Sequence, residues 1–171
     1  MAERTGVLTV GGNPVTLLGD EIRVGDKAPD FTAADNDLNP FRFSELAGKI
    51  VILSAVTSLD TGTCDVETRR FNTEAANLGD DVVILTISMD LPFAQKRWCG
   101  AAGVDKVRVV SDYKAAEFGE KYGVLIKEQR LLARSIFVID RDGVVRYTQI
   151  VSENADEPDY EPVLEAARKL A

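Results

Sequence analysis

Four apolar runs rich in β-branched residues recur along the chain, and the first three are each followed by a segment with helical character. The runs are Ile50–Val56, Val82–Ser88, Val107–Val110 and Ser135–Ile139. Such runs are typical of strands buried on both faces, and helical crossovers place successive strands parallel in one sheet. No linker, repeat or low-complexity tract interrupts the pattern, so we predict a single α/β domain over residues 1–171.

The segment after the second run predicts a short helix. Asp90 can cap its start, Pro92 sits at a position that tolerates proline, and Gly100 supplies the stop. The residues at helical spacing that we expect to face the core are Leu91, Ala94 and Trp98.

The remaining segments complete the predicted order. Helices are expected to begin near Cys64 and to span residues 115–122 and 160–170. A glycine turn predicts an N-terminal β-hairpin at about residues 7–18, and residues 144–150 read as the antiparallel return of the last run. This order resembles a thioredoxin-like three-layer sandwich with an extra N-terminal β-hairpin.

Charge and hydropathy exclude several classes of protein. The formal net charge is −8, which argues against a nucleic-acid partner and against binding to anionic membranes. No signal-peptide stretch and no run of 18 apolar residues is present, so we expect a cytoplasmic protein.

The supply of metal and redox ligands is small. The chain has two cysteines and no histidine, so common zinc sites and Cys–His pairs are excluded. The cysteines do not form a C-x-x-C pair, so the usual dithiol of a disulfide reductase is absent.

Cys64 lies where a thiol is easily ionised. It follows the small polar run Asp60–Thr63, which is typical of a helix start. A sulfur in the first helical turn faces unpaired N–H groups and the positive end of the helix dipole, and both favour the reactive thiolate. If the protein performs chemistry, we expect the reaction to begin at Cys64.

Two other residues could support that sulfur. Thr61 stands three residues before Cys64, so its hydroxyl could turn back toward the sulfur, or it could simply cap the helix. Arg134 opens the last apolar run on the face of Ile136 and Val138. A buried guanidinium needs a partner, which could be the thiolate or an ordinary Asp or Glu.

Cys99 ends the short helix and could be a small buried apolar residue. Alternatively, a sulfenic acid at Cys64 could condense with it to give an intramolecular disulfide. Because two helices packed beside a sheet normally hold their sulfurs apart, we expect this disulfide to require unwinding of the Cys99 helix and of the first turn after Cys64.

Taken together, these segments resemble the peroxiredoxins, and specifically the bacterial thiol peroxidases that form an intramolecular disulfide. The resemblance runs from about Val7 to Leu170. It is carried by residues 12–17, 24–31, 60–64, 88–95, 97–100, 133–134 and 157–160, in this order and spacing.

The resemblance implies a role for each candidate residue. Cys64 would be the peroxidatic nucleophile, Thr61 its hydroxyl partner, Arg134 the activating guanidinium and Cys99 the resolving cysteine. It also implies no metal or organic cofactor, a hydroperoxide substrate, reduction by thioredoxin or a similar dithiol, and a homodimer.

One position departs from the family pattern. The family loop reads P-x-x-x-T-x-x-C, and here Thr57 stands in the place of the proline. Threonine adds a hydroxyl near the pocket and leaves the loop less stiff than proline would. We therefore expect Cys64 to be less shielded, and more easily over-oxidised by peroxide, than in a Thr57→Pro variant.

Two other functions remain open from the residues alone. A disulfide oxidoreductase of the same fold would use both cysteines without peroxide. A non-catalytic interaction domain would use the cysteines only for packing.

Overall fold

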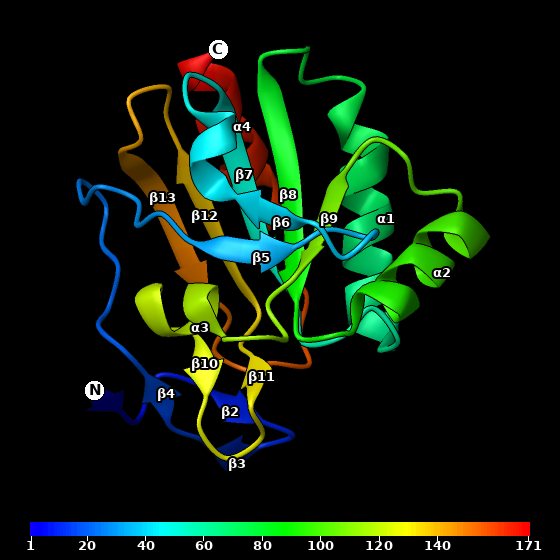
Figure 1. The fold of residues 1–171 in the computed structure, drawn as a ribbon. Coiled ribbons are helices and arrows are strands. Elements are labelled where there is room, and N and C mark those ends of the chain that lie inside the picture. Colours follow the sequence, from blue (N-terminus) through cyan, green and yellow to red (C-terminus); the bar gives the residue numbers. More distant parts are fainter.

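A seven-stranded sheet forms the centre of the molecule (Figure 1), and the computed structural model describes all residues from 1 to 171. In spatial order its strands are β13 (Val145–Ile150), β12 (Ser135–Ile139), β7 (Ile50–Ala55), β8 (Val82–Ser88), β9 (Arg108–Ser111), β5 (Thr32–Ala34) and β6 (Pro40–Arg42). Only the neighbouring pairs β7–β8 and β8–β9 are parallel. The strands on either side pair antiparallel, so the sheet is less parallel than the sequence predicts.

Helices cover both faces of this sheet. On one face, α1 (Gly62–Ala75), α2 (Pro92–Ala102) and α4 (Tyr160–Leu170) enclose an apolar cluster that includes Cys64. On the other face, α3 (Glu117–Lys121) and the 3-10 helix η1 (Phe43–Leu46) pack with the N-terminal segment around a second cluster. The predicted three-layer α/β sandwich is confirmed.

The N-terminal hairpin is smaller than predicted. β2 (Thr9–Val10) and β3 (Asn13–Pro14) pair around Gly11 and Gly12, whose φ angles are 56° and 82°. Two left-handed residues in sequence make a tight hairpin turn, which glycine permits. The pairing ends at residue 14.

The rest of the predicted hairpin belongs to a second sheet. β4 (Leu17–Leu18) pairs with β1 (Glu3–Arg4) and with β10 (Leu125–Ile126), which in turn pairs with β11 (Leu131–Leu132). This small sheet lies below the central sheet in Figure 1.

The capping predicted for α2 is wrong. Its N-cap is Leu91, Gly100 lies inside the helix, and the helix ends at Gly103 in the left-handed conformation with φ 68°. The predicted buried face is also wrong, because Leu91 and Ala94 are exposed and Trp98 is only partly buried. The buried residues of the helix are Pro92 and Gln95.

Other boundaries match the prediction more closely. β8, β12 and α4 have the predicted limits. α3 is shorter than the predicted 115–122 because Ala116 takes a left-handed φ of 51° and the helix begins after it. The carboxylate of Asp112 accepts from the N–H groups of Phe118 and Gly119 at this start.

The ends of β7 and β8 and the start of β12 lie together at one end of the central sheet, which we call the site edge. The parallel strands β7 and β8 both end there, since Ala55 pairs with Ile87. β12 runs antiparallel to β7 and begins at that edge, since Ser135 pairs with Ala55. Residues that follow β7 therefore lie beside residues that precede β12.

Candidate active site

Cys64 lies in the first turn of α1, as predicted, and its side chain is completely buried. Thr61 is the N-cap, and its hydroxyl oxygen accepts from the Cys64 N–H at 3.4 Å. The same hydroxyl donates to the carbonyl oxygen of Ser58 at 3.0 Å. Of the two readings of Thr61, the structure therefore shows the cap.

Arg134 comes immediately before β12 and is 2% exposed. Its Nε donates to the carbonyl oxygen of Asn154 at 3.0 Å, and its NH1 nitrogen lies 3.3 Å from a carboxyl oxygen of Glu67. Its backbone N–H donates to Oδ1 of Asn154 at 2.7 Å. The partner of the guanidinium is thus a glutamate, the second of the two predicted possibilities, and not the sulfur of Cys64.

Glu67 joins the guanidinium to the cysteine helix. It lies three residues after Cys64 on α1, which places both side chains on one face of the helix. Glu67 is fully buried, its Oε1 has no hydrogen-bond partner, and burial raises its pKa to about 8 against the opposing effect of Arg134. Burial thus favours the protonated carboxyl more than in an exposed glutamate, while the contact with Arg134 favours the carboxylate.

Asp90 fastens the loop that leads to Cys64. Its carboxylate accepts from the Ser58 hydroxyl at 2.6 Å, the Leu59 N–H at 2.8 Å and the Ser88 hydroxyl at 2.7 Å. These bonds connect the loop after β7 to the end of β8. This role for Asp90 replaces the predicted helix cap.

Thr57, in the same loop, makes two hydrogen bonds through its hydroxyl. Oγ1 donates to the carbonyl oxygen of Leu132 at 3.1 Å and accepts from Nδ2 of Asn154 at 2.7 Å. The hydroxyl that the sequence places near the pocket is therefore held between two other segments.

Cys99 is partly buried on α2 and packs against the same apolar cluster as Cys64. Both cysteines are free, and both helices are complete. Burial raises the pKa of the Cys99 thiol, which disfavours its thiolate in this conformation.

Polar contacts tie the two cysteine helices together. The Trp98 indole N–H donates to Asp65 at 3.0 Å, and Arg69 donates to the same carboxylate. Arg69 also reaches the carbonyl oxygen of Ala102 at 3.3 Å and lies over the Trp98 ring. We call Asp65, Arg69 and Trp98 the α1–α2 clasp.

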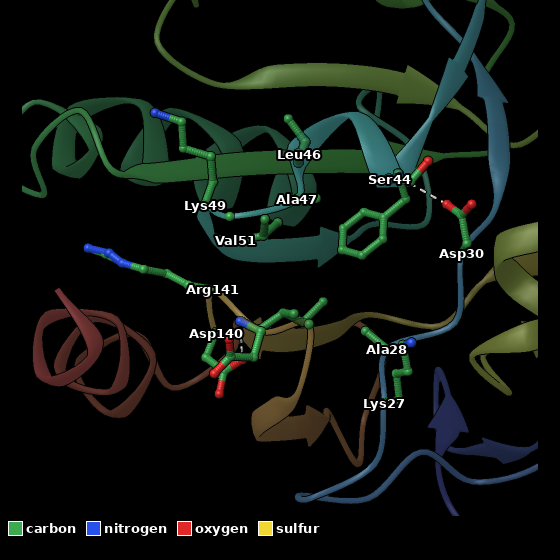
Figure 2. Close-up of a pocket in the computed structure, with 15 residues that line it drawn as sticks. Lys27, Ala28, Asp30, Ser44, Leu46, Ala47, Lys49, Val51, Asp140 and Arg141 are labelled. Atoms are coloured by element: carbon green, nitrogen blue, oxygen red, sulfur yellow. Dashed lines mark hydrogen bonds between the residues drawn. The ribbon is translucent and has the colours of Figure 1, made fainter.

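A cavity of about 380 Å³ lies at the opposite end of the sheet (Figure 2). Lys49, Val51 and Arg141 line it, and Lys49 precedes β7 whereas Cys64 follows that strand. The cavity is therefore separate from the cysteine site.

The structure contains neither a membrane-spanning helix nor a cluster of metal ligands. None of the helices combines the length and apolar character needed to cross a membrane. No three His, Cys, Asp or Glu side chains are grouped as a metal site.

Sequence reasoning missed Glu67, Asn154 and the role of Asp90. Glu67 had a usable signal, because an acidic residue three positions after Cys64 must share its helix face. Asn154 had none, because its position depends on how the chain leaves β13.

Comparisons with known proteins identify the family of the chain. The Redoxin family model matches residues 23–164. The chain is 55% identical over 163 residues to a thiol peroxidase of Bacillus subtilis, covering 95% of this chain and 97% of that protein. It is 53% identical over 161 residues to a thiol peroxidase of Halalkalibacterium halodurans, covering 94% of this chain and 96% of that protein.

Solved structures support the same assignment. A peroxiredoxin-like protein from Aquifex aeolicus superposes with a TM-score of 0.91 at 40% identity, covering 98% of each chain. A thiol peroxidase from Chromobacterium violaceum shares the fold with a TM-score of 0.84 at 19% identity, covering 95% of each chain. The chain therefore belongs to the peroxiredoxin family, in its bacterial thiol peroxidase branch.

Proposed function

We propose that this thiol peroxidase reduces hydrogen peroxide and organic hydroperoxides with Cys64 as the peroxidatic residue and Cys99 as the resolving residue. The observation that carries the proposal is the position of Cys64. Cys64 lies in the first turn of α1, about one helical turn before Glu67, which forms a buried pair with Arg134. The helix N–H groups favour the thiolate of Cys64. Glu67, on the same helix face, brings the Arg134 guanidinium to the cysteine helix.

In the first step, the Cys64 thiolate attacks the terminal oxygen of the hydroperoxide. An S–O bond forms, the O–O bond breaks, and the leaving oxygen departs as an alkoxide or hydroxide that takes up a proton. Helix N–H groups and the Arg134 guanidinium stabilise the charge on that oxygen, and the Thr61 hydroxyl donates to it once it has turned away from the Ser58 carbonyl oxygen. The products are a Cys64 sulfenic acid and an alcohol or water.

In the second step, Cys99 attacks the sulfenic sulfur, and water leaves as the disulfide forms. The raised pKa of the buried Cys99 thiol makes it a poor nucleophile while α2 is folded. Local opening of α2 both exposes the thiol and lets it approach Cys64. A dithiol protein such as thioredoxin then reduces the disulfide by thiol–disulfide exchange.

Amide hydrogen exchange on the reduced and oxidised forms tests this opening. We expect lower protection in the oxidised form at residues 60–70 and 91–103. Equal protection of both segments in the two forms would contradict the proposed rearrangement.

The working assembly is a cytoplasmic homodimer in this proposal. Leu91 and Phe93 are 52% and 66% exposed at the start of α2, next to Asp90 and the loop it holds. Such exposed apolar side chains suit a contact with a second copy. Sedimentation should give a dimer, and replacing both residues with serine should shift the protein toward monomer.

Peroxide consumption coupled to thioredoxin tests the residue roles. Cys64→Ser should abolish turnover, while Cys99→Ser should still consume one equivalent of peroxide and then stop. Turnover that persists in Cys64→Ser would refute the assignment. Exchange with protein disulfides but no reaction with peroxide would favour the disulfide oxidoreductase, and ordinary thiol reactivity of Cys64 would favour the interaction domain.

A further inference from the structure

Thr57 connects three segments that meet at the site edge. It follows β7, its hydroxyl donates to Leu132 in β11, and it accepts from Asn154 in the loop after β13. Proline at this position would carry neither the donor nor the acceptor. The contact therefore exists only because this chain has a hydroxyl residue here.

Asn154 carries the contact onward to the guanidinium. Its Nδ2 donates to Thr57 at 2.7 Å, its Oδ1 accepts from the backbone N–H of Arg134 at 2.7 Å, and its carbonyl oxygen accepts from Nε of Arg134 at 3.0 Å. Asn154 is 5% exposed, so these bonds are shielded from water. One amide side chain thus links the loop before Cys64 to both the backbone and the side chain of Arg134.

The other side-chain contact of Arg134 is with Glu67. Nη1 of Arg134 donates to Oε2 of Glu67 at 3.3 Å, which is longer than the 3.0 Å contact of Nε with Asn154. Because Asn154 also binds the backbone N–H of Arg134, the orientation of Arg134 depends on Asn154 and on what holds Asn154.

We propose that Thr57 is a positioning residue for peroxide reduction, acting through Asn154 to hold the Arg134 guanidinium in its reactive orientation. This inference rests on the proposed role of Arg134. The threonine hydroxyl restrains the loop before Cys64 through its hydrogen bonds, whereas a proline would restrain the same loop by fixing its backbone.

The test uses Thr57→Val, Thr57→Ser and Thr57→Pro in a Cys99→Ser background, where Cys64 is the only cysteine. Valine keeps the shape of threonine and removes the hydroxyl, whereas serine keeps the hydroxyl. Thr148→Val is the matched control, because Thr148 is a half-buried threonine on β13 outside this network. The rates of Cys64 with hydrogen peroxide and with iodoacetamide are measured for each variant.

Peroxide reduction develops negative charge on a leaving oxygen, which the proposed mechanism places next to Arg134. In alkylation by iodoacetamide the leaving group is iodide, a large anion that accepts hydrogen bonds weakly, so the alkylation rate depends less on Arg134. We expect Thr57→Val to lower the peroxide rate roughly tenfold, less than the ~100-fold or more lost when a direct charge-stabilising donor is removed. Its iodoacetamide rate should fall much less, and Thr57→Ser should stay close to the parent. The NMR signal of the Arg134 Nε–H should shift in Thr57→Val but not in Thr57→Ser.

Three outcomes would overturn the inference: equal peroxide rates for Thr57→Val and Thr148→Val, a loss in Thr57→Ser as large as in Thr57→Val, or an equal fall of both rates. If Thr57→Val does not fold, Thr57→Ala is compared with Thr57→Ser in the same way. Arg134→Lys shows which of the two proposed roles fails, that of Arg134 or that of Thr57. If it reacts as fast as the parent, the role of Arg134 is wrong; if it is slow while Thr57→Val is not, only the role of Thr57 is wrong.

Discussion

At the scale of single residues, the site depends on a buried pair of a guanidinium and a carboxyl group. Arg134 and Glu67 are 2% and 0% exposed and lie 3.3 Å apart. Burial of such a pair is costly, and leaving the guanidinium buried without a partner would cost more. Glu67 therefore helps to keep Arg134 inside the protein, while burial raises the pKa of the carboxyl.

Glu67 should make stability depend on pH. A carboxyl with the ordinary pKa of 4.5 loses its proton in the unfolded chain, whereas folded Glu67 keeps it up to about pH 8. Between these values the folded state holds the extra proton, so the free energy of unfolding falls as pH rises. The fall is a few kcal/mol at most, since each pKa unit corresponds to about 1.4 kcal/mol.

Denaturant unfolding of Glu67→Gln between about pH 5 and about pH 8.5 measures this effect. Across this range the folded parent protein is expected to hold about one more proton than the unfolded chain. We expect a flatter profile than in the parent, while Glu74→Gln on the same helix keeps the parent's slope. A Glu67→Gln profile as steep as the parent's would mean that Glu67 is ionised in the fold.

Arg134→Lys should slow the reaction of Cys64 with peroxide by about 100-fold, because lysine cannot reach Asn154 and Glu67 with a planar set of donors. Stopped-flow oxidation measures the rate. Arg146→Lys, which alters an ion pair with Asp140 away from the site, is the control. A rate within about twofold of the parent would remove Arg134 from the mechanism.

At the scale of helices, the α1–α2 clasp opposes disulfide formation. Asp65, Arg69 and Trp98 hold together the two helices that the disulfide must rearrange. α2 begins without a side-chain cap and is only 11 residues long, so few contacts besides the clasp and Gln95 fix it.

Trp98→Phe should speed the conversion of the Cys64 sulfenic acid to the disulfide several-fold. Phenylalanine keeps an aromatic ring but loses the N–H that donates to Asp65. Quenched-flow mass spectrometry follows the disulfide, and Arg97→Gln on the neighbouring exposed position is the control. A rate no faster than that of the control would mean that the clasp does not limit the opening.

The limits of α4 could be predicted from the sequence and those of α2 could not, for a physical reason. The limits of α4 were predictable because Val163, Leu164 and Ala167 form a clear apolar stripe that packs on the sheet. α2 has no such stripe, since its buried residues are a proline and a glutamine. Its cap was mispredicted because Asp90 bonds to Ser58 and Leu59, which lie about thirty residues away in the chain.

At the scale of the whole molecule, the antiparallel direction of β12 assembles the site. It returns the start of β12 to the edge where β7 ends, so Arg134 meets residues of α1. The sequence predicted the central strands β7, β8, β9 and β12, the return strand β13, the position of Cys64 and the face of Arg134. It did not predict β5 and β6 or their antiparallel pairing. It did not predict Asn154, whose contacts depend on the path of a loop between β13 and α4.

The packing of α1 against this framework should dominate its stability. Phe71 is fully buried and contacts Tyr160 of α4 with ring centroids 5.5 Å apart. Phe71→Ala should therefore lower the free energy of unfolding by about 3–5 kcal/mol. Chemical denaturation checks the value, with Val24→Ala at an exposed position expected to change it by less than about 1 kcal/mol.

The central claim is that Cys64 is the thiol that peroxide oxidises. The most direct measurement is peptide mass spectrometry of the Cys99→Ser protein after a brief treatment with one equivalent of hydrogen peroxide and a sulfenic acid trap. The trap should be found on Cys64 in nearly every molecule, at a rate far above that of free cysteine. An unmodified Cys64, or a rate equal to that of free cysteine, would contradict the account.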